Sequence, residues 1–144
     1  MQTVRDVLER KGHQVWTVQA RQTVYEALEI LAEKDVGALL VCDGDDAVGM
    51  FSERDYARQV ILKGKSSKDT PVRDVMSTHL LFASPEQKME ECMALMTEKR
   101  IRHLPVLEQG RIVGMISIGD VVKAVLEEKQ FLIQQLESYI TLGD

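Results

Sequence analysis

The chain has 144 residues, of which 44% are hydrophobic, so it is long enough for one compact domain or for two small domains that share a core. Its formal net charge of −5 argues against a nucleic-acid duplex as a partner, because phosphate contacts need a basic face. The sequence shows no apolar run of the length of a membrane span, and its first residues lack the apolar core of a signal peptide. We therefore expect a cytoplasmic protein with no membrane partner.

The first half of the chain alternates helical and strand patterns. Apolar residues at helical spacing follow Thr3, a favourable cap, and a second helical stripe begins after residue 23. The nearly continuous apolar run of residues 36–42 predicts a buried strand, and the polar turn after it predicts a hairpin. The elements expected here are helix 3–10, strand 15–18, helix 23–34, strand 36–42, strand 47–51 and helix 53–62.

The second half follows the same order. Pro71 stands where helices favour proline, and the Val-Arg-Asp-Val of residues 72–75 repeats that of residues 4–7. Pro105 cannot donate to a strand ladder, so we expect an edge or a bulge at that point. The elements expected here are lead-in 71–76, strand 80–83, helix 85–99, strand 102–107, strand 111–117 and helix 119–129.

The two halves are copies of one another. Residues 49–55 and 114–120 share glycine, methionine, serine and aspartate in the same order, and the copies are 65 residues apart. A repeat of about 60 residues buries little surface alone, so we expect the two copies to pack face to face. The expected organisation is a first repeat with its lead-in helix over 1–63, a linker over 64–70, a second repeat over 71–129 and a C-terminal helical extension over 130–144.

The C-terminal extension has no counterpart in the first copy. Its apolar residues keep helical spacing, so this face should bury against the rest of the chain or against a second subunit. These residues are Phe131, Leu132, Leu136, Tyr139 and Ile140. Cys42 and Cys92 lie in apolar runs without Cys-x-x-Cys spacing, and we interpret both as reduced core residues.

The chain closely resembles the CBS-domain family, in the tandem arrangement that is also called a Bateman module. The resemblance extends from Val4 to about Lys129 and is most specific in the two Gly-x-x-Ser-x-x-Asp segments and in the strand from Arg102 to Val106. It implies an α/β (α+β) fold of two β-α-β-β-α repeats packed with pseudo-twofold symmetry, plus a C-terminal helix. It also implies clefts that bind AMP, ADP, ATP or an NAD-type ligand, in a homodimer that controls a partner protein in trans.

Two serine–aspartate pairs stand where a strand ends and a helix begins: Ser52 with Asp55, and Ser117 with Asp120. The pattern Ser-x-x-acid is close to a capping box, in which the two side chains satisfy backbone amides at the helix start. The resemblance implies that each aspartate also accepts two hydrogen bonds from a ribose diol, while the serine hydroxyl and the helix-start amides face an anion. Capping alone and capping with ribose binding are the two interpretations of each pair.

Positive charge for the nucleotide phosphates has three candidates: Arg54, Arg102 and His103. Arginine suits this role best, because its planar fork can hold two phosphate oxygens at once. The alternatives are a solvated helix-surface charge for Arg54 and a structural role for His103. Since Arg102 and His103 are adjacent in an extended segment, their side chains point to opposite faces and only one can enter a given cleft.

The adenine ring needs a narrow apolar slot with backbone donors and acceptors. Small walls are offered by Thr17, Val36, Gly37 and Ala38 in one copy and by Ala83 and Ile101 in the other. The resemblance implies that each cleft takes its aspartate from one repeat and much of its base slot from the other. Because Gly119 stands in the second copy where Arg54 stands in the first, we hypothesise that the two clefts differ in affinity or in ligand.

Catalysis is the alternative class, and the sequence favours it little. The chain lacks a Gly-x-Ser-x-Gly elbow, a Gly-x-x-x-x-Gly-Lys phosphate loop and a His-Glu-x-x-His pair, and its three histidines have no metal-ligand spacing with cysteine. We therefore predict that the protein is not an enzyme and that it has no catalytic residues, no catalytic cofactor and no metal site. A second alternative is a scaffold that has lost its nucleotide and binds a protein through the dimer surface and the C-terminal helix.

Overall fold

The structure is a computed structural model that describes the backbone of residues 1–143 and the side chains of residues 1–139. The last residue of the expected extension, Asp144, and the side chain of Ile140 lie outside the described residues. The chain forms two compact units, which are named here by their connectivity. The continuous unit is residues 15–81, and the split unit combines residues 1–14 with the chain from Phe82 onward.

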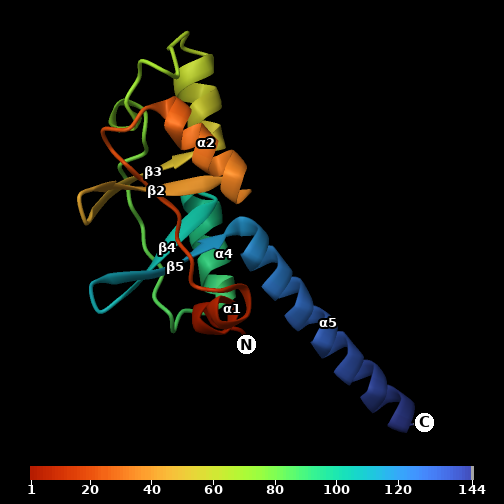
Figure 1. Ribbon diagram of the computed structural model, residues 1–144. Coiled ribbons are helices and arrows are strands. Elements are labelled where there is room, and N and C mark those ends of the chain that lie inside the picture. Colours follow the sequence, from red (N-terminus) through yellow and green to blue (C-terminus); the bar gives the residue numbers. More distant parts are fainter. Residues whose placement is uncertain (144) are drawn as a thin grey trace. The chain divides into compact units, whose positions relative to one another are not determined.

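The continuous unit is built on a three-stranded sheet in the order β1-β2-β3. The hairpin of β2 and β3 is labelled in Figure 1. β1 is parallel to β2, and β2 is antiparallel to β3. Its elements are β1 (Thr17–Gln19), α2 (Val24–Lys34), β2 (Ala38–Asp43), β3 (Asp46–Ser52), α3 (Glu53–Asp55), η1 (Tyr56–Ile61) and η2 (Val72–Asp74). The strands bury Leu39, Val41 and Phe51 in one core, and α2 adds the apolar stripe that begins at Val24.

The split unit has a two-stranded antiparallel sheet, β4-β5. Its elements are α1 (Val4–Lys11), α4 (Met89–Lys99), β4 (His103–Glu108), β5 (Arg111–Ser117) and α5 (Ile118–Gly143). Leu104 and Ile116 are fully buried on the strands, and Met89, Cys92 and Met96 are buried on α4. The predicted mixed α/β fold with a C-terminal helix is therefore confirmed, and Cys42 and Cys92 are free, buried thiols as expected.

The lead-in segments are exchanged between the repeats. α1 precedes the first repeat in the chain, but it belongs to the split unit, which contains the second repeat. There Val4 N donates to Gln87 O at 2.8 Å, and the matching bond of the continuous unit runs from Val72 N to Gln22 O, also at 2.8 Å. The packing of the lead-ins thus differs from their order in the chain, in which each stands directly before its own repeat.

The prediction of a strand over residues 80–83 is wrong, because the second repeat keeps only one β-bridge there, at Ala83. In the first repeat, the amides of Ala20 and Leu40 donate the bonds that flank the equivalent bridge. Their counterparts 65 residues later are Pro85 and Pro105, which have no N–H to donate. The two prolines remove both flanking bonds, and the strand shrinks to a single residue.

Three expected helices, 53–62, 71–76 and 85–99, differ in length or type from the structure. The last begins only at Met89, because Pro85 lies in the turn before it. The lead-in of the second repeat is reduced to η2, a single 3₁₀ turn. The first changes after Asp55 into the π-helix η1, in which Leu62 N donates to Ala57 O five residues earlier.

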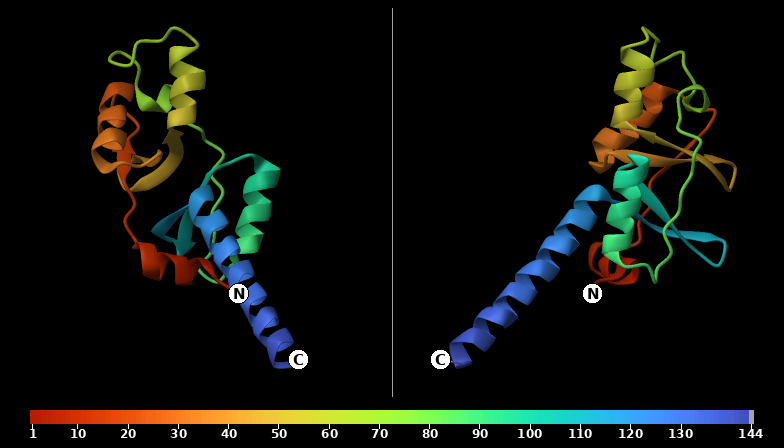
Figure 2. Two further views of the ribbon diagram at one scale, coloured as in Figure 1. Left: turned by 90° about the vertical axis from the view of Figure 1, so that its right-hand side faces the viewer. Right: turned by 180° about the vertical axis from the view of Figure 1, so that it is seen from behind.

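The expected C-terminal extension is continuous with the last helix of the second repeat. α5 has 26 residues, and its C-terminal half extends away from the rest of the split unit (Figures 1 and 2). Its apolar side chains are exposed to 62% at Phe131, 55% at Leu136 and 78% at Tyr139. Of the two expected positions for this face, burial against its own chain is therefore wrong for these residues.

Candidate functional site

Ser117 and Asp120 form a reciprocal cap at the start of α5 in the split unit. β5 ends at Ser117 and the helix begins at the next residue, where the first amides have no partner inside the helix. Ser117 N donates to Asp120 Oδ2 at 2.9 Å, and Asp120 N donates to Ser117 Oγ at 3.1 Å. The predicted capping role of this pair is confirmed, and it fixes the carboxylate at the carboxyl end of a strand.

Lys11 lies beside this carboxylate, and the sequence interpretation missed it. Its Nζ donates to Asp120 Oδ2 at 2.6 Å and to Met115 O at 2.9 Å. Gly114 lets α1 approach, because a Cβ at that position would lie 2.6 Å from Leu8 Cδ2. The repeated lead-in was visible in the sequence, but only its exchange between the repeats brings Lys11 to Asp120.

The charges around Asp120 set the protonation state of the site. Burial acts to raise the pKa of Asp120, but the bonds from Lys11 and Ser117 outweigh it and lower that pKa below its usual value. His103 pairs with Ser117 across the sheet. Burial and the nearby Lys11 lower the pKa of His103, against the opposing effect of Asp120. At neutral pH the site therefore presents a carboxylate, an ammonium and a neutral imidazole.

A Lys11→Met variant keeps the length of the side chain and removes its charge. We expect the pKa values of Asp120 and His103 both to rise, because Lys11 lowers each of them. The lowered pKa of Asp120 stabilises the fold above the unfolded value of 3.8, and this contribution disappears as the pH falls through the folded value. NMR titration of both groups measures the change.

Lys129→Met is the matched control, since Lys129 is an exposed lysine of α5 that lies nine residues after Asp120. The control should leave the pKa values of Asp120 and His103 where they are in the natural protein. Unchanged pKa values in Lys11→Met would show that the ion pair does not form in solution.

The continuous unit repeats the cap at the end of β3. Ser52 N and Ser52 Oγ donate to Asp55 Oδ2 at 2.9 and 3.0 Å, and Asp55 N donates to Ser52 Oγ at 3.2 Å. Glu53 N donates to Gly37 O at 3.1 Å, as Ile118 N donates to Arg102 O at 2.8 Å in the split unit. The capping role is confirmed here too, and the two turns share one hydrogen-bond pattern.

The remaining predicted site residues divide between the two units. Within the continuous unit, Ala38 pairs with Ser52, so the segment from Val36 to Ala38 lies beside the cap, while Thr17 is exposed on β1. Arg54 is half-buried and lies between the capping residues Ser52 and Asp55 in the chain. The split unit holds Ala83, Ile101, Arg102 and His103.

Within the split unit, His103 and Arg102 lie near the Asp120 cap and Ala83 does not. His103 is half-buried and its neighbour Arg102 is exposed, in agreement with opposite faces of an extended segment. Ala83 is 1% exposed and pairs with Val106, three residues further along β4 than His103. In this unit Ala83 is a core residue.

Neither a metal centre nor a membrane span is found among the described residues. No group of three or more histidine, cysteine, aspartate or glutamate side chains among residues 1–139 is arranged to hold a metal ion. In the described part of the chain, no helix combines the length and apolar character needed to cross a membrane.

Residues 3–61 and 72–127 each match the CBS domain family. The chain therefore belongs to the CBS-domain family, whose members include regulatory and signal-transduction proteins. A mitochondrial CBS domain-containing protein of Arabidopsis thaliana, CBSX3, is 40% identical over 98% of this chain and 73% of its own length. The CBS domain-containing protein YhcV of Bacillus subtilis is 35% identical over 83% of each chain.

Solved structures give the same result. A CBS-domain protein from Burkholderia ambifaria MC40-6, assigned to signal transduction, is 50% identical and superimposes with a TM-score of 0.85 over 88% of this chain and 95% of its own. The CBS-domain containing protein ATU1752 from Agrobacterium tumefaciens is 38% identical, with a TM-score of 0.81 over 85% of this chain and 98% of its own. The chain is thus similar along most of its length to proteins that consist largely of the same pair of domains.

Proposed function

We propose that this protein is a regulatory module that binds an adenine nucleotide, and that binding controls a partner protein in trans. The ligand is AMP, ADP, ATP or an NAD-type molecule. The observation that carries the proposal is the carboxylate fixed by a serine at the same strand-to-helix turn of both units. Membership of the CBS-domain family supports the choice of ligand class.

Each aspartate has capacity left for a ligand after it has capped its helix. All bonds found to Asp55 and Asp120 carboxylates within the described part of the chain go to Oδ2. A carboxylate offers about four lone-pair positions, two on each oxygen. Oδ2 already accepts two bonds in each unit, so the two positions of Oδ1 remain for the two ribose hydroxyls. A ribose diol fits this acceptor geometry, and capping fixes the acceptor before the ligand arrives.

The two sites offer different positive charge for phosphate groups. The ammonium of Lys11 lies beside Asp120, whereas Arg54 adjoins Asp55 in the chain. An ammonium acts as a compact point charge, whereas a guanidinium presents a planar fork that holds two oxygens. The difference supports unequal affinity, or different ligands, at the two sites.

Regulation follows if the ligand binds two arrangements of the protein with different affinity. A nucleotide can shift a conformational equilibrium only by that difference in binding free energy. We propose that the bound and free forms show different surfaces to the partner protein. We also propose a homodimer in the cytoplasm, and the exposed apolar face of α5 supports association with a second subunit.

Thermal unfolding in the presence of separate nucleotides tests the proposal. We expect AMP, ADP, ATP or NADH to raise the Tm with increasing dose, because a ligand bound only by the native state stabilises it, by about 2.7 kcal/mol at a concentration of 100 Kd. A pyrimidine nucleotide such as CMP is the control, since it carries the same ribose phosphate without adenine.

The result would contradict the nucleotide proposal if none of the adenine compounds moved the Tm. A scaffold is then the second candidate, favoured by the exposed side chains of Phe131, Leu136 and Tyr139 on α5. A partner retained by the natural protein, but not by a variant with serine at these three positions, would identify that function.

A further inference from the structure

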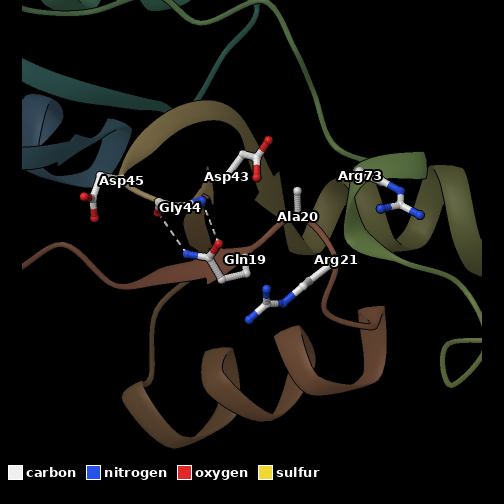
Figure 3. A pocket seen from close by; sticks show the side chains of 7 residues that line it. All are labelled: Gln19, Ala20, Arg21, Asp43, Gly44, Asp45 and Arg73. Carbon is white, nitrogen blue, oxygen red and sulfur yellow. Dashed lines mark hydrogen bonds between the residues drawn. The ribbon is translucent and has the colours of Figure 1, made fainter.

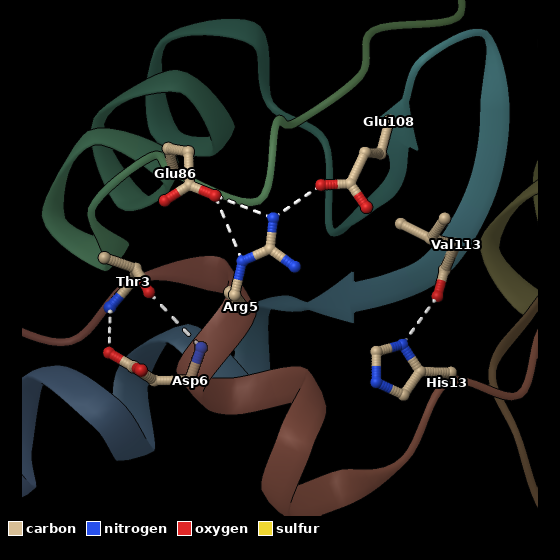
Figure 4. A network of polar contacts seen from close by, with 7 residues as sticks. All are labelled: Thr3, Arg5, Asp6, His13, Glu86, Glu108 and Val113. Atoms are coloured by element: carbon tan, nitrogen blue, oxygen red, sulfur yellow. Dashed lines mark hydrogen bonds and ion pairs between the residues drawn. The ribbon is translucent and has the colours of Figure 1, made fainter.

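Arg5 of the split unit is held by two carboxylates (Figure 4). Its Nε and Nη2 donate to Glu86 Oε1 at 3.0 and 2.7 Å, and Nη2 also donates to Glu108 Oε2. Guanidinium–carboxylate bonds of this kind are charge-assisted and directional. The lead-in of this unit therefore carries an arginine that binds a carboxylate at a defined place.

The internal repeat puts Arg73 at the equivalent place of the continuous unit. Arg5 N donates to Pro85 O at 2.8 Å, and Arg73 N donates to Ala20 O at 3.0 Å. Ala20 and Pro85 are separated by the same 65 residues as the two copies of the repeat. The backbones of both arginines are thus held by equivalent hydrogen bonds. In the split unit, the arginine in this position binds the carboxylate of Glu86.

One charge is reversed between the two units. Glu86 corresponds to Arg21, whereas Glu108 corresponds to Asp43, which is also acidic. Arg73 therefore has one acidic neighbour but lacks the carboxylate that accepts two bonds in the split unit. Among the described residues, neither Arg21 nor Arg73 takes part in an ion pair.

Arg21 and Arg73 line a cavity of about 610 Å³ beside the turn between β2 and β3 (Figure 3). Arg21 comes from the turn after β1 and Arg73 from η2. The opposite wall is fixed, because Gln19 Nε2 donates to Gly44 O at 3.1 Å and Gly44 N donates to Gln19 Oε1 at 2.9 Å. One wall of the cavity is therefore held by hydrogen bonds, and the exposed side chains of Arg21 and Arg73 line the cavity.

We propose that this cavity binds a small oxyanion, a phosphate or carboxylate group, between Arg21 and Arg73. The anion takes the place that the Glu86 carboxylate fills in the split unit. Guanidinium forks match pairs of oxygens in both kinds of anion. Asp43 and Asp45 also line the cavity and offset its positive charge, so binding depends on direct contact of the anion with the two guanidinium groups.

This site is separate from the proposed nucleotide site of the same unit. Asp43 and Asp45 flank the start of β3, whereas Ser52 and Asp55 lie at its end. The seven residues of β3 span roughly 23 Å at about 3.3 Å per residue. One small anion cannot occupy both places, so either site can be tested without the other.

An Arg21→Glu variant recreates the charge arrangement of the split unit. We expect its new carboxylate to bind Arg73, to exclude the external anion and to raise the Tm by a few degrees. Arg73→Gln removes the second guanidinium and serves as an independent test of the same cavity. Arg58→Glu is the matched control, because Arg58 is an exposed arginine of the same unit that does not line the cavity.

The measurement is an NMR titration of the amides of Ala20 and Gly44, without nucleotide. Inorganic phosphate and acetate are the two probes, each against sodium chloride of the same ionic strength. Saturable shifts are expected with at least one probe in the natural protein and in Arg58→Glu, and the tighter probe defines the ligand class. Binding should be at least tenfold weaker in Arg21→Glu and Arg73→Gln. The absence of saturable binding of either probe to the natural protein, or equal binding by Arg21→Glu, would overturn the proposal.

Discussion

Replacing Asp120 or Asp55 by alanine is expected to lower nucleotide affinity at the affected site by at least 100-fold, or about 2.8 kcal/mol. Each carboxylate is proposed to accept two ribose hydroxyls, and a hydrogen bond to a charged group contributes about 1.5–3 kcal/mol. Calorimetry with the adenine nucleotide that raises the Tm most measures both variants against the natural protein. Because Lys11 binds Asp120 while Arg54 adjoins Asp55, the two losses should be unequal.

Loss of a cap also weakens the fold, so a control must separate capping from binding. Thr23 and Glu26 form the same kind of capping box at the start of α2, and neither residue is a candidate site residue. Glu26→Ala should lose a cap, worth about 0.5–2 kcal/mol, and keep full nucleotide affinity. Equal affinity in all three variants would show that Asp55 and Asp120 only cap their helices, and identical losses at the two sites would contradict the proposed difference between them.

Phe51→Ala is expected to destabilise the continuous unit by about 3–5 kcal/mol. Phe51 is fully buried and lies in the core that β2, β3 and α2 share, so truncation leaves a cavity as well as removing apolar contacts. Urea unfolding followed by fluorescence measures the loss. Trp16, the only tryptophan in the sequence, packs against this core and reports on the continuous unit.

Phe51→Leu is the milder control, because it keeps most of the apolar volume and should cost a smaller part of the stability. Ile116 is the residue 65 positions later and is fully buried in the split unit. Ile116→Ala should therefore unfold without the same early change in Trp16 fluorescence. A loss below about 1 kcal/mol in Phe51→Ala would mean that the core relaxes around the missing ring.

The parts of the fold that depend on local chemistry could be predicted from the sequence. The capping serines Ser52 and Ser117 indicate where a helix starts, because each hydroxyl accepts a hydrogen bond from the backbone amide three residues later. The hairpins follow from apolar runs that flank polar turns, and the family resemblance follows from the repeat itself. These signals involve neighbours in the chain, so one sequence contains both partners of each contact.

The parts that depend on distant partners could not be predicted in the same way. Lys11 reaches Asp120 across 109 positions, and nothing within α1 marks it as a site residue. The loss of the strand at Ala83 needs Pro85 and Pro105 together, since each removes a bond on one side of the same bridge. An alignment of the two repeats shows that Pro85 and Pro105 replace Ala20 and Leu40. It does not show which hydrogen bonds are lost unless the pairing of the strands is already known.

The exchanged lead-ins also determine the order in which this protein can assemble during translation. The continuous unit leaves the ribosome as one uninterrupted stretch and can fold as soon as it has emerged. α1 emerges before the continuous unit, and Asp120 is synthesised 109 residues after Lys11, or roughly 5–20 s later at about 5–20 residues per second. A helix of eight residues is too short to be stable alone during that interval. The split unit is therefore completed late, because the segment that contains α1 stays unstructured until the second repeat has been made.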